Sequence, residues 1–321
     1  HTPEDVLTYA VVYIRIYFLG MIPNLIYNMG AGILRAVGDS KRPLYFLIGS
    51  CMVNILLDII LVAGLRMGVA GAAIATISSQ FFSACMVVYA LTHTEDMYKL
   101  VWSKVRIDGR MLQRIVRIGI PAGMQSVMYN ISNIIIQSGV NTLGTDNVTA
   151  WATYGKVDGL YWMMINALGI SVTTFVGQNY GAGKKERIRT GIREGVILTI
   201  LINIPLALML LCIPEFLTSF MLNDASIISY TRDFLAVTGI CLFPLGWLFV
   251  FRNGCQGMGH TFVPMLSGVL EVSLRVVMVK LLTPYLAFRG VALAEVSAWI
   301  GAWIMLMITY RIYQERTDSF R

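Results

Sequence analysis

The stretch PNLIYNMGAGILRAVGDSKRP at residues 23–43 returns in outline 221 residues later, as PLGWLFVFRNGCQGMGHTFVP at residues 244–264. Two prolines and one of the glycines between them recur at identical spacing: Pro23, Gly38 and Pro43 match Pro244, Gly259 and Pro264. Further along, GVA at 68–70 returns as GVA at 290–292. An internal repeat in a polytopic membrane chain is typical of a carrier whose two halves surround a shared site.

The composition places the chain in a membrane. It is 56% hydrophobic and 13% charged, with a mean hydropathy of +0.68, which excludes an ordinary soluble globule. Because a helix needs about 20 apolar residues to cross the hydrocarbon core, we expect nine spans. They lie at 8–34, 43–64, 68–92, 114–141, 148–176, 191–213, 229–252, 262–284 and 288–313. Short alternating strands are absent from the sequence, so we predict an all-α, polytopic membrane helix bundle.

Basic residues predict the orientation of the spans. If the loop after the first span is cytoplasmic, 18 of the 25 Lys and Arg residues fall on that side, with Arg252 among them. The opposite loops contain Arg66 and Arg289. The positive-inside rule therefore predicts a multi-pass protein of the bacterial plasma membrane with a cytoplasmic C-terminus.

The repeat also predicts the organisation of the parent protein. Spans one to three match spans seven to nine, and the even number of intervening spans gives the copies the same orientation, so the repeat is parallel. Spans four to six then need partners upstream of residue 1, which predicts a parent of roughly 430–440 residues and twelve helices in two lobes. We divide the chain into half of an N-lobe (1–95), a cytoplasmic connector (96–113), a six-helix C-lobe (114–313) and a cytoplasmic tail (314–321).

Several motifs, in this order and spacing, resemble those of multidrug and toxic compound extrusion (MATE) transporters. They are LRAVGDS (34–40) followed by Pro43, Asn54-x3-Asp58, GVAGAAIAT (68–76), Gly119-x-Pro121 and GQNYGAG (177–183). The resemblance covers essentially all 321 residues, as helices four to twelve of that family. It implies two six-helix lobes that export organic, often cationic, compounds in exchange for Na⁺ or H⁺.

Asp58 is the leading candidate for ion coupling. A carboxylate within a span is costly to insert, about 2.5–3.5 kcal/mol, and is a functional candidate by default. Asn54 lies one helical turn away on the same face, and Thr76 on the next span adds a hydroxyl. Such oxygen donors suit a hard cation, a possible Na⁺ at Asp58, whereas a desolvated Asp58 suits proton exchange. The alternative is a structural acid that hydrogen-bonds Asn54 and locks two helices together.

The resemblance further implies substrate contacts in the N-lobe at Tyr13 and Asn28. An aromatic ring attracts a flat cation by about 0.5–2 kcal/mol, although a Tyr near a span end is also a common interface anchor. One MATE branch carries a Glu on its seventh helix, ten residues after the Gly of Gly-x-Pro. Here that position is Tyr129, which argues against a C-lobe ion site of that type and favours Asp58.

The C-lobe contains its own embedded charges. Glu271 and Arg275 are one turn apart, and we expect them to form an intrahelical pair. Glu295 lies in the ninth span, and Lys156 and Asp158 lie in the fifth. Charges inside a bundle are either structural or line a wet cavity, so Glu271, Arg275 and Glu295 are candidates for the substrate cavity.

The sequence favours a secondary active multidrug exporter that works by alternating access. The alternative is a flippase for lipid-linked saccharides of the same superfamily. An enzyme is disfavoured because three scattered His and five Cys without a CxxC supply no catalytic or metal cluster. The GAGK at 181–184 lacks the Ser or Thr of a P-loop, so energy from ATP is not expected. We expect a monomer in the lipid bilayer, small organic substrates, no nucleic-acid partner and no cofactor beyond the coupling ion.

Overall fold

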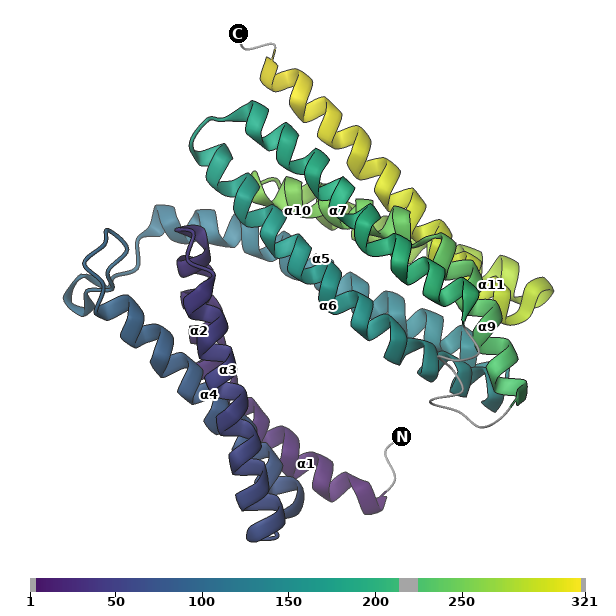
Figure 1. The fold of residues 1–321 in the computed structure, drawn as a ribbon, viewed down its shortest axis with the longest axis horizontal. Helices are drawn as coiled ribbons and strands as arrows, with labels where there is room; N and C mark the ends of the chain where they lie inside the picture. The colour runs from purple at the N-terminus through teal and green to yellow at the C-terminus, as the bar shows by residue number, and fades with distance from the viewer. Residues whose placement is uncertain (1–3, 214–224, 319–321) are drawn as a thin grey trace. The chain divides into compact units, whose positions relative to one another are not determined.

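Helices make up all the regular structure in the described part of the chain. The computed structural model describes residues 4–213 and 225–318, and every regular element in them is helical, as predicted (Figure 1). The chain separates into two compact units, His1–Ile107 and Asp108–Arg321. The boundary between them falls within the stretch 96–113 that we assigned as a connector.

The first unit contains three long helical segments. α1 (Glu4–Leu19) and α2 (Met21–Ala36) meet at a bend, and α3 (Lys41–Asp58) continues directly into the π-helical turn η1 (Ile59–Gly64). α4 (Gly68–Thr92) returns antiparallel to α3, and a short 3-10 helix, η2 (Trp102–Lys104), lies in the following loop. The core packs Tyr27, Leu34 and Phe46 against Val87 and Leu91.

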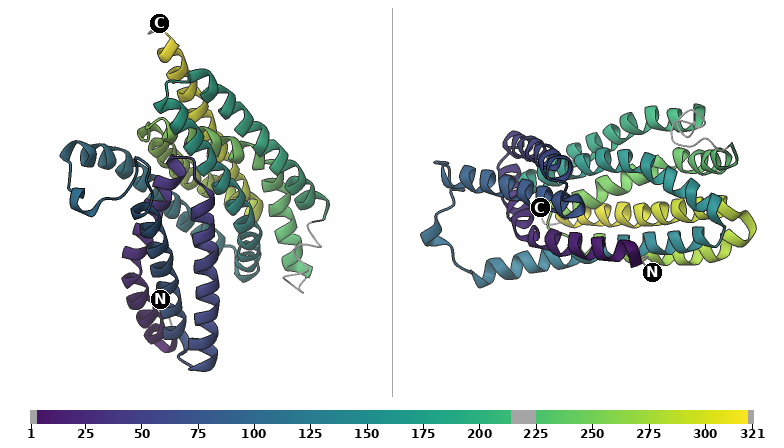
Figure 2. Two further views of the ribbon diagram at one scale, coloured as in Figure 1. Left: turned by 60° about the vertical axis from the view of Figure 1, so that its left-hand side comes forward. Right: turned by 90° about the horizontal axis from the view of Figure 1, so that it is seen from below.

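The helices of the second unit lie side by side (Figure 2). Its core surrounds Tyr161, Phe234, Leu245 and Trp299. α11 contains the non-helical residue Ala287, with φ 47°, so it consists of two helical segments. The helices are α5 (Gly109–Asn141), α6 (Thr145–Gly181), α7 (Lys185–Cys212), α9 (Ala225–Ile240), α10 (Leu242–Gly257) and α11 (Phe262–Asp318).

The two copies of the repeat fold alike. α2 and α10 are both 16 residues long, and both begin after a bend, of 43° between α1 and α2 and of 49° between α9 and α10. Each is followed by a glycine with positive φ, Gly38 at 95° and Gly259 at 80°. Each of the predicted spans 8–34 and 229–252 is therefore a bent pair of helices rather than one straight helix. At the first bend a Cβ on Gly20 would lie 2.4 Å from the Gln80 side chain, so the glycine lets the chain turn close to α4.

Five helices in the described residues are long and apolar enough to cross a membrane, or up to seven if each bent pair is one span. The predicted spans 262–284 and 288–313 correspond to the two segments of α11. The predicted span 114–141 lies in α5, which is not among these helices because a row of polar side chains interrupts its apolar surface. The predicted tail is helical up to Asp318, and its last residues, 319–321, lie outside the described part.

Candidate functional site

Asp58 lies where α3 passes into the π-helical turn η1. π-helical turns are rare in proteins, and those that occur are often found at functional sites. They interrupt the regular pattern of backbone hydrogen bonds in the helix. The carboxylate is half-buried, and its Oδ1 atom is buried without a hydrogen-bond partner among the described residues. Asp58 therefore has an acceptor that a proton or a cation can satisfy.

The register between α3 and α4 places the other two predicted donors near this level of the bundle. Ser50, two turns before Asp58 on the same face, donates to the carbonyl of Ser79 on α4 at 2.6 Å. Asn54 follows on that face and is half-buried, whereas the Thr76 hydroxyl donates to Ala72 of its own helix at 2.9 Å. Within residues 4–213 and 225–318, no hydrogen bond joins these three side chains, and no group of three or more His, Cys, Asp or Glu is placed to hold a metal ion.

The other two N-lobe candidates lie on the bent pair α1–α2. Tyr13 is half-buried and stacks on Tyr17 with 5.9 Å between ring centroids. Asn28 is exposed, and its amide donates to the side chain and carbonyl of Asn24, at 2.5 and 2.9 Å. Each of these contacts joins two residues of the same helix and gives no information about a ligand. The role of Tyr13 and Asn28 as substrate contacts remains a prediction.

In the second unit the predicted Glu271–Arg275 pair is wrong, because each residue pairs with a different helical segment. Glu271 forms an ion pair with Arg252 of α10, and both side chains are buried. Arg252 also donates to Ser267 at 3.3 Å. The assignment of Arg252 to a cytoplasmic loop is therefore wrong as well. Its guanidinium lies inside the helix bundle, where a buried charge requires a partner.

Arg275 pairs with Glu295 across the break in α11, with Nη2 and Oε1 3.4 Å apart. Its other terminal nitrogen donates to Asn133 of α5 at 3.2 Å. The side chains of Arg275 and Glu295 are 1% and 8% exposed, which makes this one of the most deeply buried charge pairs in the described structure. Even so, Glu295 Oε2 and Arg275 Nε have no hydrogen-bond partner among the described residues.

Asp158 adds a fifth charge to this region. It accepts a hydrogen bond from Tyr154 at 3.2 Å and lies within electrostatic reach of Arg275, while Lys156 is exposed. With all five groups ionised, three carboxylates face two guanidiniums, leaving an excess of one negative charge. We name this set the buried charge cluster: Asp158, Arg252, Glu271, Arg275 and Glu295. One bound proton or cation neutralises it.

A cavity of about 360 Å³ adjoins the buried charge cluster at Arg252. Its aromatic wall is formed by Tyr129, Trp162 and Phe249. The ring centroid of Trp162 lies 4.9 Å from that of Tyr129 and 5.1 Å from that of Phe249. Its polar wall includes Gln256, which donates to Gln125 at 2.7 Å. Flat apolar faces beside amides and a buried cation are suited to a planar, hydrogen-bonding organic molecule.

Comparison with known proteins identifies the family. A family model described as MatE matches residues 1–60 and 121–281, more than half of the chain. The chain belongs to the MatE family. It is 29% identical over 244 residues to the probable multidrug resistance protein YoeA of Bacillus subtilis, covering 74% of this chain and 53% of that protein. It is 24% identical over 293 residues to the probable multidrug resistance protein NorM of Thermotoga maritima, covering 90% and 62%.

Solved MATE structures share the fold. A crystal structure of MATE in the bent conformation superposes with a TM-score of 0.92 at 20% identity, covering 99% of this chain and 72% of that one. The chain thus spans between half and two thirds of the length of the two curated MatE relatives. The family model and these relatives confirm the predicted family, and the superposition confirms the predicted fold.

The sequence analysis did not identify several uncharged polar residues that line the cavity beside Arg252 or contact the buried charge cluster in this MatE protein. Asn133 and Gln125 carry no charge, so they were not selected within their apolar run, and Gln256 lay beyond the predicted end of its span at 252. A signal was present, because Gln125, Tyr129 and Asn133 recur every four residues and therefore occupy one face of α5. Arg252 was missed because its span was predicted to end at that residue, whereas α10 continues to Gly257.

Proposed function

We propose that this protein exports organic, often cationic, compounds by antiport with Na⁺ or H⁺ and works by alternating access. The names of the MatE relatives, which are multidrug resistance proteins, support this reading. The observation that carries it is Asp58, a carboxylate with a buried, unpartnered oxygen at a π-helical turn within an apolar helix. Intramembrane acids of this kind are the usual sites of ion coupling.

In the proposed cycle the ion and the substrate favour different arrangements of the transporter. Binding of Na⁺ or H⁺ at Asp58, assisted by Asn54 and Thr76, shifts the conformational equilibrium in one direction, and binding of the organic compound shifts it in the other. An inward-negative potential contributes about 2.3 kcal/mol per 100 mV for each positive charge that enters. No cofactor other than the coupling ion takes part.

Two separate sets of substrate contacts are proposed: Tyr13 and Asn28 in the first unit, and the cavity beside Arg252 in the second unit. Glu271 acts on this cavity through Arg252, which lines it, and Arg275 and Glu295 lie deeper in the buried charge cluster. The protein is proposed to be a monomer of the bacterial plasma membrane with its C-terminus in the cytoplasm.

The test uses the full-length protein in proteoliposomes loaded with ethidium, under separate Na⁺ and H⁺ gradients. Wild type should extrude the dye under one of these gradients, Asp58→Asn should abolish extrusion, and Asp146→Asn, an exposed acid at the start of α6, should leave it unchanged. If Asp58→Asn still extrudes, Asp58 is a structural acid and coupling lies elsewhere, with the buried charge cluster as the next candidate. If wild type extrudes under neither gradient, the flippase becomes the better reading.

A further inference from the structure

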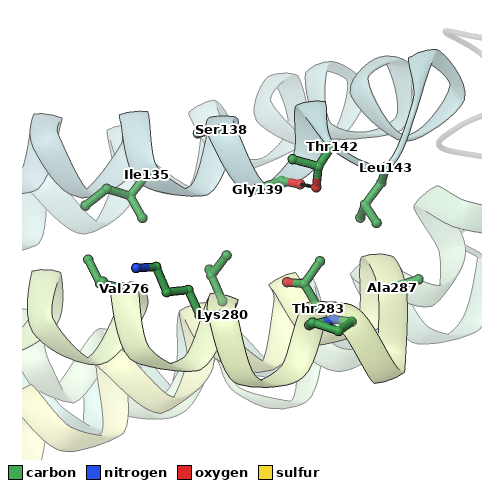
Figure 3. A pocket seen from close by; sticks show the side chains of 11 residues that line it. Ile135, Ser138, Gly139, Thr142, Leu143, Val276, Lys280, Thr283 and Ala287 are labelled. Atoms are coloured by element: carbon green, nitrogen blue, oxygen red, sulfur yellow. Dashed lines mark hydrogen bonds between the residues drawn. The ribbon is translucent and has the colours of Figure 1, made fainter.

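A groove at one end of the second unit has a chemistry that the proposed export function does not use. Figure 3 shows it between α5 and the first segment of α11, and its volume is about 690 Å³. It lies beside the turn at 142–144 and the helix break at Ala287. At its centre the helices approach closely, since a Cβ on Gly139 would lie 2.8 Å from Val279. The groove is therefore a furrow between two packed helices at the end of the bundle.

The walls of the groove are mostly aliphatic and continue onto an apolar surface. Ile135, Val276 and Val279 line it. Next to them, Ile134 and Val277 are 68% and 49% exposed, so apolar side chains flank the groove on both helices. In a membrane-spanning bundle such a surface contacts acyl chains, and a furrow in it accommodates one of them.

Lys280 is the one charged residue among those that line the groove, all of which lie in the described part. Its side chain extends into the space between the two helices (Figure 3). It is exposed and has no ion-pair partner among the described residues. A lysine with an apolar stem and a free ammonium near a helix end positions its charge at the level of the lipid head groups.

Two hydroxyl groups line the same groove. Thr283, one turn after Lys280, has a buried Oγ1 without a hydrogen-bond partner among the described residues, and Ser138 lines the groove from α5. None of the lining residues is acidic. An ammonium together with hydroxyl donors suits the phosphate oxygens of a ligand, and the aliphatic walls require that this ligand carry a hydrocarbon chain.

We propose that this groove binds one anionic phospholipid, with the phosphate at the Lys280 ammonium and an acyl chain along the aliphatic walls of the groove. A free phosphate ion leaves the aliphatic walls unused, and a zwitterionic lipid adds a second cation beside Lys280. The bound lipid stabilises the packing of α5 against α11 at the end of the bundle that contains the break at Ala287. This site does not depend on transport.

The test measures lipid retention by the purified full-length protein in native mass spectrometry. The probes are phosphatidylglycerol, phosphatidylcholine with the same acyl chains, and glycerol 3-phosphate, which lacks them. Wild type should retain phosphatidylglycerol in preference to the other two. Lys280→Gln should raise its apparent Kd about tenfold, the loss of one charge-assisted contact, whereas Lys280→Arg should retain binding. Lys156→Gln, which removes an exposed lysine on α6, is the matched control.

Three outcomes overturn the proposal. The first is an equal loss of phosphatidylglycerol in the Lys280→Gln and Lys156→Gln proteins, which indicates general attraction to a basic surface. The second is equal retention of phosphatidylglycerol and phosphatidylcholine. The third is binding of glycerol 3-phosphate as tight as that of the lipid, which assigns the groove to a soluble phosphate compound. Ser138→Trp, which fills the groove without changing its charge, should also displace the lipid, and unchanged retention in this variant counts against the groove.

Discussion

Glu295→Gln should destabilise the protein far more than its conservative shape suggests. The substitution removes the charge that faces Arg275 at 3.4 Å, inside a region where the two side chains are 8% and 1% exposed. At an effective dielectric constant of about 20, two unit charges at this separation attract by about 5 kcal/mol. Loss of Glu295 leaves the buried Arg275 guanidinium without its nearest carboxylate, with Asp158 as the remaining acid within electrostatic reach, so we expect a loss of up to about 3–5 kcal/mol in the free energy of unfolding.

The measurement is SDS-induced unfolding of the full-length protein in mixed micelles, followed by circular dichroism. Removing the two charges together, with Arg275→Met and Glu295→Leu, should restore most of the stability because neither Arg275 nor Glu295 is then left buried without its partner. A double-mutant cycle isolates the coupling between the two residues. The control is Lys99→Gln, which breaks the Lys99–Glu95 pair, in which the side chains are 39% and 92% exposed. This variant should show no measurable change, because solvent screens such pairs.

The reasoning is refuted if Glu295→Gln is no less stable than Lys99→Gln. That result would mean that water solvates Arg275 and that the charge cluster is not shielded from solvent. A double variant less stable than either single variant also contradicts the argument, because it indicates that packing of these side chains, rather than their charge, stabilises the region.

Other parts of the fold make separate predictions. Gly257→Val should lower stability by about 1–3 kcal/mol, since a Cβ there would lie 2.7 Å from the carbonyl oxygen of Thr173 and force α10 away from α6; an unchanged unfolding midpoint contradicts this packing. Gly259→Ala should lower stability by about 1–2 kcal/mol because φ is 80° at this position. The variant that carries both Gly257→Val and Gly259→Ala should be no more stable than either single variant. Burial lowers the pKa of His260, which stacks on Tyr313 at 4.4 Å between ring centroids, so the unfolded chain binds the proton more tightly. Stability should therefore be complete above pH of about 6.5 and fall as the pH drops below it, and thermal unfolding of His260→Phe between pH 5 and 8 should lose this dependence.

Much of the architecture could be predicted because the signals are local. Apolar runs of span length predict helices from composition alone, and the repeated Pro and Gly residues predicted that 23–43 and 244–264 have equivalent structures. The positions of the bends at Gly20 and Cys241 were not predicted, since an apolar run looks the same whether its helix is straight or broken. The π-helical turn after Asp58 was missed for the same reason.

The sequence by itself determined the helical class, the family and, apart from Arg252, which residues carry charge inside the bundle, because hydropathy, motif spacing and residue type are all legible along one chain. Only the tertiary structure decided which of those charges meet. Glu271 and Arg275 are four residues apart, yet they pair with Arg252 and Glu295 on other helical segments, and Arg275 contacts Asn133, 142 residues away. The rotation of each helix about its axis selects these partners, and that rotation is set by packing between helices, as at Gly257 against Thr173. Helical spacing limits a side chain to one face, but the neighbouring helix determines what that face contacts.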